Sequence, residues 1–178
     1  MKNEIVIAGF GGQGILFSGK ILVYAGMMDG HQVSWLPSYG PEMRGGTANC
    51  SVIISDDPIG SPIVNDPEIL IAMNLPSLDK FEQAILKGGL AFIDSTLITR
   101  KVDRDDVKCF YIPATQMANE SGMTGLANMI MLGKVVKELP SCNLETIFKA
   151  LQKVVPERKR EMLQKNIKAV EMGFEYQD

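Results

Sequence analysis

The 178-residue sequence predicts an α/β protein with three layers, α/β/α, around a mostly parallel or mixed sheet. Short apolar runs alternate with helical patterns along the first two thirds of the chain, which is typical of strands alternating with helices. A glycine-rich turn joins the first apolar run to the first helical pattern and predicts a Rossmann-like first βα unit. Apolar positions at helical spacing predict a helical C-terminal third. The length fits a single domain over residues 1–178.

Six short apolar runs have the length of buried strands. A seventh segment contains Pro62 and directly follows Pro58, and neither proline has an amide hydrogen to donate to a sheet ladder. That segment therefore predicts an edge hairpin and favours a mixed sheet. The six runs are residues 5–8, 31–36, 48–55, 69–73, 90–93 and 110–112, and the hairpin is residues 59–64.

Apolar residues three and four positions apart predict the helices. In the first helix, Gly19 lacks a side chain and so lets the helix lie close to the sheet. The second ends before Gly88 and Gly89, where a left-handed C-cap costs little. Pro156 separates two apolar stripes in the last third, which bury either in the core or against another subunit. The predicted helices are residues 15–28, 75–87 and 126–136, and the stripes span residues 144–155 and 163–174.

The turn at residues 9–14 is the first candidate site. Its glycines can adopt positive φ angles and let the backbone come close to a ligand. The amides of Gly11, Gly12, Gln13 and Gly14 lie where the next helix begins, and the partial positive charge there favours an anion. The turn therefore predicts a phosphate-binding cradle.

The spacing of Gly9, Gly11 and Gly14 also matches the dinucleotide fingerprint G-x-G-x-x-G, so a nicotinamide-dependent dehydrogenase is an alternative function. That fingerprint requires an acidic residue at the end of the second strand, about 20 residues on, to bind the ribose hydroxyls. Residues 31–36 contain no acid, and Asp29 lies in the turn before them. The missing acid disfavours this alternative.

The loop that follows the second predicted strand, residues 37–46, is the second candidate site. Its prolines stiffen it, its glycines, including Gly45 and Gly46, permit unusual turns, and Tyr39 offers an aromatic ring. Arg44 could bind a phosphate held by the glycine turn or a partner within its own loop, and both interpretations stay open. Ligands of open α/β sheets bind outside the carboxyl ends of strands, so we expect the two segments to form one site.

Composition disfavours several classes of function. The net charge of −3 gives no basic field for nucleic acid, and the basic residues 158–160 are flanked by Glu157 and Glu161, as on a solvated helix. The three cysteines are widely spaced and predict buried free thiols, with no zinc or iron–sulfur motif. The odd number of cysteines, together with the lack of a secretion signal and of an apolar run long enough to cross a membrane, predicts a cytoplasmic protein.

The remaining polar candidates favour structural roles. Asp94 and Thr96 follow a predicted strand and are typical of a cap on the next turn. Asn128 lies in an apolar helix, where a buried amide needs hydrogen-bond partners. His31 is the single histidine, and no base or nucleophile accompanies it. We therefore expect no catalytic residue and no metal site in this chain.

Several motifs occur together in this chain: the turn at residues 9–14, the loop at 38–46, the segment at 58–62, the strand at 89–95 and the helical segment at 128–133. In this combination the chain resembles, over nearly its full length, the gamma subunit of 2-oxoacid:ferredoxin oxidoreductases. The loop resembles the 2-oxoglutarate and 2-ketoisovalerate types more than the pyruvate type.

The resemblance implies one part of a multi-subunit enzyme that oxidatively decarboxylates a 2-oxoacid with coenzyme A and reduces ferredoxin. Thiamine diphosphate and iron–sulfur clusters are then expected on partner chains, which are alpha and beta subunits and a ferredoxin-like delta subunit. This chain is expected to contribute to coenzyme A binding or gating and to assembly, and to be inactive alone. A stand-alone nucleotide-binding module is a further alternative. The expected coenzyme A contacts are Gly11, Gly12, Gln13, Gly14, Tyr39, Arg44, Gly45 and Gly46.

Overall fold

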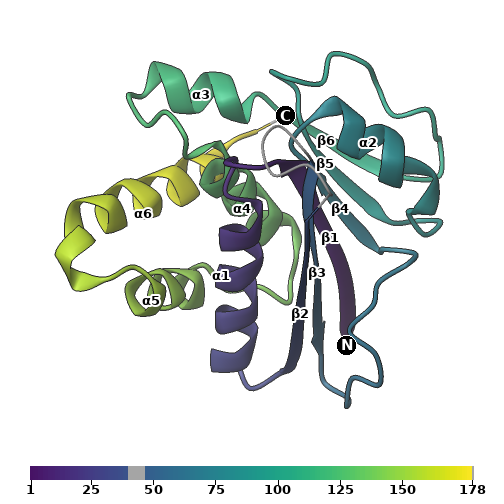
Figure 1. Cartoon of the computed structure of the whole chain (residues 1–178), viewed down its shortest axis with the longest axis horizontal. Helices are drawn as coiled ribbons and strands as arrows, with labels where there is room; N and C mark the ends of the chain where they lie inside the picture. Colours follow the sequence, from purple (N-terminus) through teal and green to yellow (C-terminus); the bar gives the residue numbers. More distant parts are fainter. Residues whose placement is uncertain (40–46, 178) are drawn as a thin grey trace.

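The computed structural model describes residues 1–39 and 47–177, which form a mixed six-stranded sheet with helices on both faces (Figure 1). The strand order is β2-β3-β1-β4-β5-β6. The strands are β1 (Lys2–Phe10), β2 (Gln32–Tyr39), β3 (Thr47–Ser55), β4 (Ile69–Ala72), β5 (Leu90–Asp94) and β6 (Lys108–Ile112). All six predicted strands are confirmed.

Strand direction brings several strand ends to one edge of the sheet. Strands β1, β4, β5 and β6 run parallel, whereas β3 is antiparallel to both β1 and β2. Strands β1 and β2 therefore point the same way although β3 lies between them. Their carboxyl ends share an edge with those of β4, β5 and β6 and with the start of β3. Ligands of open α/β sheets bind at this kind of edge.

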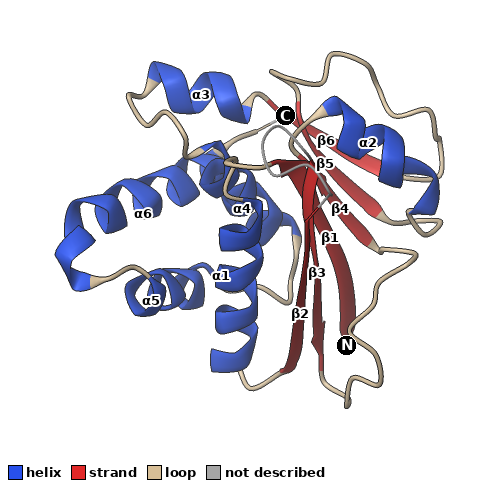
Figure 2. Ribbon diagram, viewed as in Figure 1, coloured by secondary structure: helices blue, strands red, loops and turns tan. Residues whose placement is uncertain are grey.

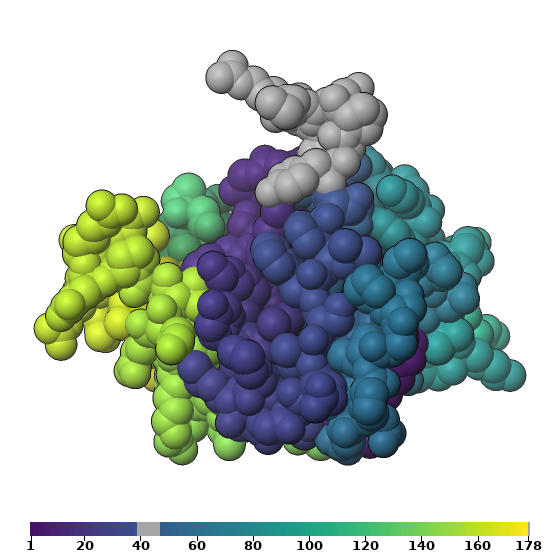
Figure 3. Space-filling model, turned by 60° about the horizontal axis from the view of Figure 1, so that its bottom comes forward, coloured from purple at the N-terminus to yellow at the C-terminus, as the bar shows by residue number. Residues whose placement is uncertain are grey.

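Helices cover the two faces of the sheet unequally. Helices α1 (Ile15–Met28) and α4 (Ala127–Glu138) lie against one face, and α5 (Leu144–Val154) and α6 (Arg160–Glu175) pack against them (Figure 2). The other face carries α2 (Leu75–Phe81), continued by a 3-10 turn at Glu82–Ala84. Figure 3 shows the same division, with the yellow-green C-terminal helices on one side of the purple-to-blue N-terminal segment and the teal middle segment on the other.

The alternation of side chains along β1 divides the core in two. Ile5 and Ile7 belong to the larger apolar cluster, under α1 and α4. Val6 and Ala8 point to the opposite face and join a smaller cluster with Leu78 of α2. Successive residues of a strand face opposite sides, so a fully buried strand must be apolar throughout. The predicted three-layer arrangement and the helical C-terminal third are confirmed.

Three details differ from the sequence predictions. Residues 59–64 form no strand, so the predicted hairpin is wrong, and the two prolines in and beside that segment cannot donate to a ladder. Helix α2 ends at Phe81 and not at residue 87, because the chain tightens into the 3-10 turn. Helix α3 (Ala114–Glu120) was not predicted, since it buries two alanines and so has no wide apolar stripe.

Helix α1 lies close to the sheet at Gly19, as the sequence predicted. A Cβ atom at Gly19 would lie 2.6 Å from Sγ of Cys50 and 3.0 Å from Nε1 of Trp35. Any side chain at this position would push the helix away from β2 and β3. The glycine therefore sets the depth at which α1, and the turn that precedes it, sit on the sheet.

Helices α4 and α6 cross with their backbones in contact. A Cβ atom at Gly133 of α4 would overlap the carbonyl of Val170, and one at Gly173 of α6 would overlap the carbonyl of Ile130. Backbone carbonyls cannot rotate away as the end of a flexible side chain can. The two glycines are thus required for the crossing that positions α6.

We expect Gly173→Ala to lower the free energy of unfolding by about 2–3 kcal/mol, because the extra methyl group must separate two packed helices. The matched control is Gly60→Ala, since a Cβ atom there would meet no atom of the described residues within 4 Å. That control should stay within about 0.5 kcal/mol of the parent. Urea unfolding measures both, and equal stabilities would show that the crossing tolerates a side chain.

Candidate functional site

The turn between β1 and α1 is held by the side chain of Gln13. Its Oε1 accepts a hydrogen bond from the backbone amide of Phe10 at 2.6 Å, and its Nε2 donates to the carbonyl of Met73 at 3.0 Å. A Cβ atom at Gly9 would lie 2.6 Å from the same Oε1. Both ends of the Gln13 amide are thus engaged within the chain, so this side chain shapes the turn and ties it to the end of β4.

Gly14 joins the turn to α4. It caps α1 with a left-handed backbone (φ 73°), and its carbonyl accepts hydrogen bonds from the amide and hydroxyl of Ser18 at 3.0 and 3.2 Å. Nδ2 of Asn128 donates to that carbonyl at 3.1 Å and to the Ser18 hydroxyl at 3.1 Å. A Cβ atom at Gly14 would overlap the Asn128 side chain. The structural role expected for Asn128 is confirmed, and it depends on glycine at position 14.

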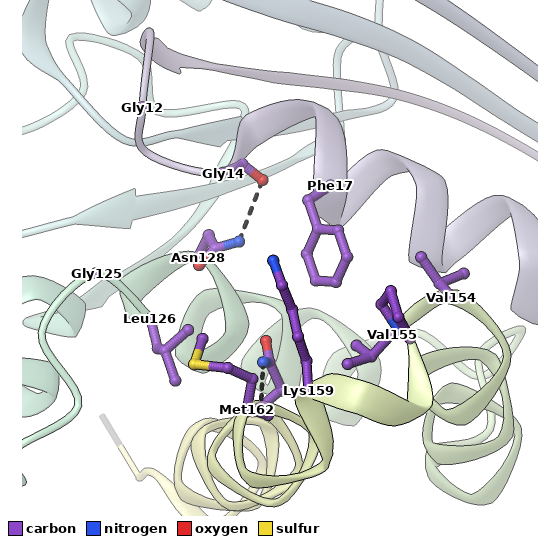
Figure 4. Close-up of a pocket in the computed structure, with 12 residues that line it drawn as sticks. Gly12, Gly14, Phe17, Gly125, Leu126, Asn128, Val154, Val155, Lys159 and Met162 are labelled. Carbon is purple, nitrogen blue, oxygen red and sulfur yellow. Dashed lines mark hydrogen bonds between the residues drawn. The ribbon is translucent and has the colours of Figure 1, made fainter.

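Gly12 is the open point of the turn. Its φ is 94°, and a Cβ atom there would have no atom of the described residues within 4 Å. A cavity of about 270 Å³ extends from Gly12 towards α4, α5 and α6 (Figure 4), and a second of about 300 Å³ extends from it towards Met73 and Thr115. Gly125, two residues before α4, lines both cavities. The backbone of Gly12 is therefore accessible from two hollows.

The second predicted segment begins and ends beside this turn. Phe10 pairs with Thr47 across β1 and β3, and Tyr39 pairs with Ala48 across β2 and β3. Both ends of the 40–46 connection therefore lie at the edge where the turn leaves β1. Arg44, Gly45 and Gly46 lie outside the described residues, and Tyr39 is described by its backbone.

The strand order also bears on the dinucleotide alternative. In the fingerprint fold, the strand that follows the first helix is a parallel neighbour of the first strand and carries the ribose-binding acid at its end. Here the neighbour of β1 on that side is the antiparallel β3, which begins at Thr47 beside Phe10. Strand β2, which follows α1, is one strand further away. Among the described residues, the strand next to β1 on that side begins at this edge, so its end supplies no carboxylate for a ribose there.

The remaining candidates occupy structural positions. Oδ1 of Asp94 accepts a hydrogen bond from the amide of Thr96 at 3.1 Å, and the hydroxyl of Thr115 donates to Oδ2 at 2.5 Å, which confirms the expected cap. His31 lies at the surface with Nδ1 2.9 Å from Asp56. Cys50 is buried, and burial raises the pKa of its thiol to about 12. Cys109 and Cys142 are free thiols that are partly exposed, so the expectation of buried thiols holds fully for Cys50.

Sequence reasoning missed the residues that the C-terminal helices bring to the turn. Lys159 and Asn166 line the cavity of about 270 Å³ together with Gly12 and Gly14. From the sequence alone, Lys159 belongs to a basic cluster typical of a solvated helix. Asn166 is a single polar residue in an amphipathic helix. No local pattern connects positions some 150 residues apart, because their proximity follows from how α6 packs on α4.

Two negative findings concern residues 1–39 and 47–177. No group of three or more His, Cys, Asp or Glu side chains there is arranged to hold a metal ion. No helix in the same residues combines the length and the apolar character needed to cross a bilayer.

Comparison with known families gives a match along almost the whole chain. The model of the family described as pyruvate ferredoxin/flavodoxin oxidoreductase matches residues 4–176. The ketoisovalerate oxidoreductase subunit VorA of Methanothermobacter thermautotrophicus is 39% identical over 174 residues, which are 97% of this chain and 36% of that protein. The 2-oxoglutarate synthase subunit KorC of Methanocaldococcus jannaschii is 37% identical over 178 residues, which are 98% of this chain and 94% of that protein. The chain thus spans about a third of the first relative and nearly all of the second.

Solved structures share the fold. The gamma subunit of a keto/oxoacid ferredoxin oxidoreductase from Geobacter sulfurreducens superposes with a TM-score of 0.83 at 31% identity, covering 97% of this chain and 96% of that one. A 2-oxoglutarate:ferredoxin oxidoreductase from Magnetococcus marinus, solved with 2-oxoglutarate, coenzyme A and succinyl-CoA bound, gives 0.88 at 23% identity. That match covers 97% of this chain and 30% of the other, and it concerns the fold.

The role of Gln13 can be tested with Gln13→Glu. A carboxylate can still accept from Phe10 but cannot donate to the Met73 carbonyl, so we expect a loss of about 1–3 kcal/mol at neutral pH. Protonation restores a donor, so the pKa of the new carboxyl is raised on folding and part of the stability returns as the pH falls. Urea unfolding at several pH values measures this. Gln32→Glu, at an exposed position of β2, is the control and should change stability little at any pH.

Proposed function

We propose the function from one premise: the chain belongs to the pyruvate ferredoxin/flavodoxin oxidoreductase family. It acts as the gamma subunit of a 2-oxoacid:ferredoxin oxidoreductase, which converts a 2-oxoacid and coenzyme A to acyl-CoA and CO₂ and passes the electrons to ferredoxin. Alpha and beta subunits, with a ferredoxin-like delta subunit, complete the enzyme in the cytoplasm. Residues 1–178 form a single domain within it.

The substrate is 2-oxoglutarate or a branched-chain 2-oxoacid. Two relatives that are more than a third identical to this chain are subunits of a ketoisovalerate oxidoreductase and of a 2-oxoglutarate synthase. Both types fit the loop sequence at residues 39–46. The pocket for the 2-oxoacid lies on partner chains, as the likeness to the gamma subunits of this family implies.

The contribution of this chain is to hold part of coenzyme A, which supplies the thiol that takes up the acyl group. The observation that carries this proposal is the open, left-handed backbone of Gly12 at the start of α1. Amides at such a position bind phosphate oxygens, and coenzyme A has three phosphate groups. The ends of the segment that contains Arg44 lie beside the same turn, so a guanidinium can reach a second phosphate.

The magnitudes show why partner subunits are needed. A helix N-terminus contributes about 0.3–1 kcal/mol to binding an anion. One charge-assisted hydrogen bond from Arg44 adds about 1.5–3 kcal/mol. Their sum is well below the roughly 8 kcal/mol of micromolar affinity. Gly11, Gly12, Gln13, Gly14, Tyr39, Arg44, Gly45 and Gly46 therefore form part of a shared site. Thiamine diphosphate and the iron–sulfur clusters are held by the other subunits.

The purified chain should not reduce viologen with coenzyme A and any 2-oxoacid, whereas the complex with alpha and beta subunits should. The reason is that the thiamine diphosphate and iron–sulfur clusters that carry the chemistry are proposed to lie on partner subunits. Adding the chain to a complex purified without it should restore coenzyme A-dependent turnover. Turnover by the chain alone would contradict the proposed function.

In the assembled enzyme, Gly12→Val and Arg44→Ala should each raise the KM for coenzyme A while leaving the KM for the 2-oxoacid nearly unchanged. For Arg44→Ala we expect about a 10- to 150-fold rise, the equivalent of one charge-assisted hydrogen bond. Arg44→Lys should recover part of this loss, since lysine keeps the charge but not the fork of donors.

Two controls separate binding from strain. Gly30 has a positive φ of 86° and open space around it, as Gly12 has, but it lies at the other end of α1. Gly30→Val therefore reproduces the backbone strain without approaching the site. Lys87→Ala removes an exposed cation just before β5, at the opposite edge of the sheet. If both variants of the site match their controls, the turn and loop serve architecture alone and the coenzyme A role is wrong.

A further inference from the structure

The corner between α5 and α6 has four exposed cations, which we call the basic corner. They are Lys153, Arg158, Lys159 and Arg160. Among residues 1–39 and 47–177, none of the four forms an ion pair with an Asp or Glu side chain. Their charges are therefore left to water or to a partner molecule.

Lysines on either side of the basic corner are paired. Lys149 lies 2.8 Å from Glu145 along α5, and Lys165 lies 2.9 Å from Glu161 along α6. Residues 153–165 contain five Lys and Arg residues and two Glu residues, a net charge of +3, whereas the whole chain has −3, which leaves −6 on all other residues. Positive charge is thus concentrated at this corner of an otherwise acidic chain, and it favours an acidic partner.

The cavity of about 270 Å³ opens beside the basic corner and has a largely apolar wall (Figure 4). Pockets for drug-sized molecules have about 300–1,000 Å³, so this one suits a single large side chain. Met162 is 43% exposed, so part of the apolar surface faces solvent. The apolar side chains of the wall are Phe17, Leu126, Val154, Val155 and Met162.

The cations and the cavity belong to the same segment of the chain. Lys159 lines the cavity and stands between the two arginines in sequence, and Lys153 directly precedes Val154 of the wall. Figure 4 shows the side chain of Lys159 extending from the corner towards Phe17. An apolar group in the cavity would therefore have positive charges beside it.

We propose that the basic corner and its cavity bind an acidic segment of a partner protein. One large apolar side chain of the segment occupies the cavity, and carboxylates on both sides of it pair with the cations of the corner. Protein interfaces commonly combine a central apolar anchor in a pocket with a polar rim, and arginine and methionine are enriched in them. The inference does not rest on the proposed function.

A small polar ligand fits the cavity less well. Apart from Lys159, the polar side chains of the lining are Asn128 and Asn166. Their Nδ2 atoms donate to the backbone carbonyls of Gly14 and Met162, and their Oδ1 atoms are buried away from solvent. The cavity therefore lacks the precisely placed polar groups that orient a small molecule.

A nucleic acid fits the charge distribution less well. A long polyanion that reached the basic corner would also meet the rest of the chain, which has a net charge of −6. A short acidic segment needs to contact the corner alone. The apolar wall also has no use in binding a phosphate backbone.

The test is fluorescence anisotropy of a labelled peptide, Asp-Glu-Asp-Phe-Glu-Asp-Glu, titrated with the full chain at low ionic strength. Saturable one-to-one binding is expected. A peptide with serine in place of phenylalanine should bind about tenfold more weakly, because it leaves the cavity empty. Absence of saturable binding, or equal binding of the two peptides, would overturn the proposal.

Charge reversal tests the corner itself. The double variant Arg158→Glu with Arg160→Glu should weaken binding of the acidic peptide about fivefold or more. It should also bind the reversed peptide Lys-Arg-Lys-Phe-Arg-Lys-Arg better than the parent chain does. The matched control is Lys80→Glu with Lys87→Glu, which reverses two exposed lysines on other elements and should change binding little. Equal binding of the acidic peptide by both double variants would contradict the proposal.

Competition identifies the kind of partner. Coenzyme A and a short DNA oligonucleotide are each added to the complex of the chain with the acidic peptide. Retention of the peptide in the presence of both supports the inference. Displacement by coenzyme A would assign the corner to the phosphates of the cofactor and overturn the inference, while leaving the proposed function intact. Displacement by the oligonucleotide would assign the corner to nucleic acid and also overturn it.

Discussion

The contact between Gly14 and Asn128 fixes the geometry on which the candidate site depends. The Asn128 amide reaches the Gly14 carbonyl because glycine leaves room for it, and the left-handed backbone that this requires also begins α1. Helix α4 is thereby held against the start of α1. Helix α6 crosses α4 at Gly133 and Gly173. The position of α6 therefore also depends on the contact between Gly14 and Asn128. Gly12 and Gly125, which precedes α4, line both cavities beside the turn.

The antiparallel strand β3 has the second decisive effect. By lying between β1 and β2, it directs both of these strands to the same edge and brings its own start there as well. The two strand ends that flank the connection containing Arg44 therefore lie beside the glycine turn. In a dinucleotide-binding sheet the second strand would lie in this position and supply a ribose-binding acid. The insertion of β3 thus changes which side chains lie beside the glycine turn, and so which ligand groups can be bound there.

Local patterns predicted the sheet and the glycine turn because both depend on neighbours in sequence. The apolar run around Ile7 indicates a buried strand, and Gly19 indicates close packing, by rules that need no distant residue. The roles of Gln13 and of the α6 residues follow from contacts with Met73 and with the turn, which are 60 or more residues away. Helix α3 was not predicted, because its buried residues are Ala114 and Ala118. Two small alanines give almost no hydrophobic periodicity.

The backbone of the turn is shared by two cavities. Gly12 and Gly125 line both of them. Both glycines have positive φ and open space around them, so their backbone can adjust without moving a side chain. A ligand that orders this backbone from one cavity would therefore also order part of the wall of the other.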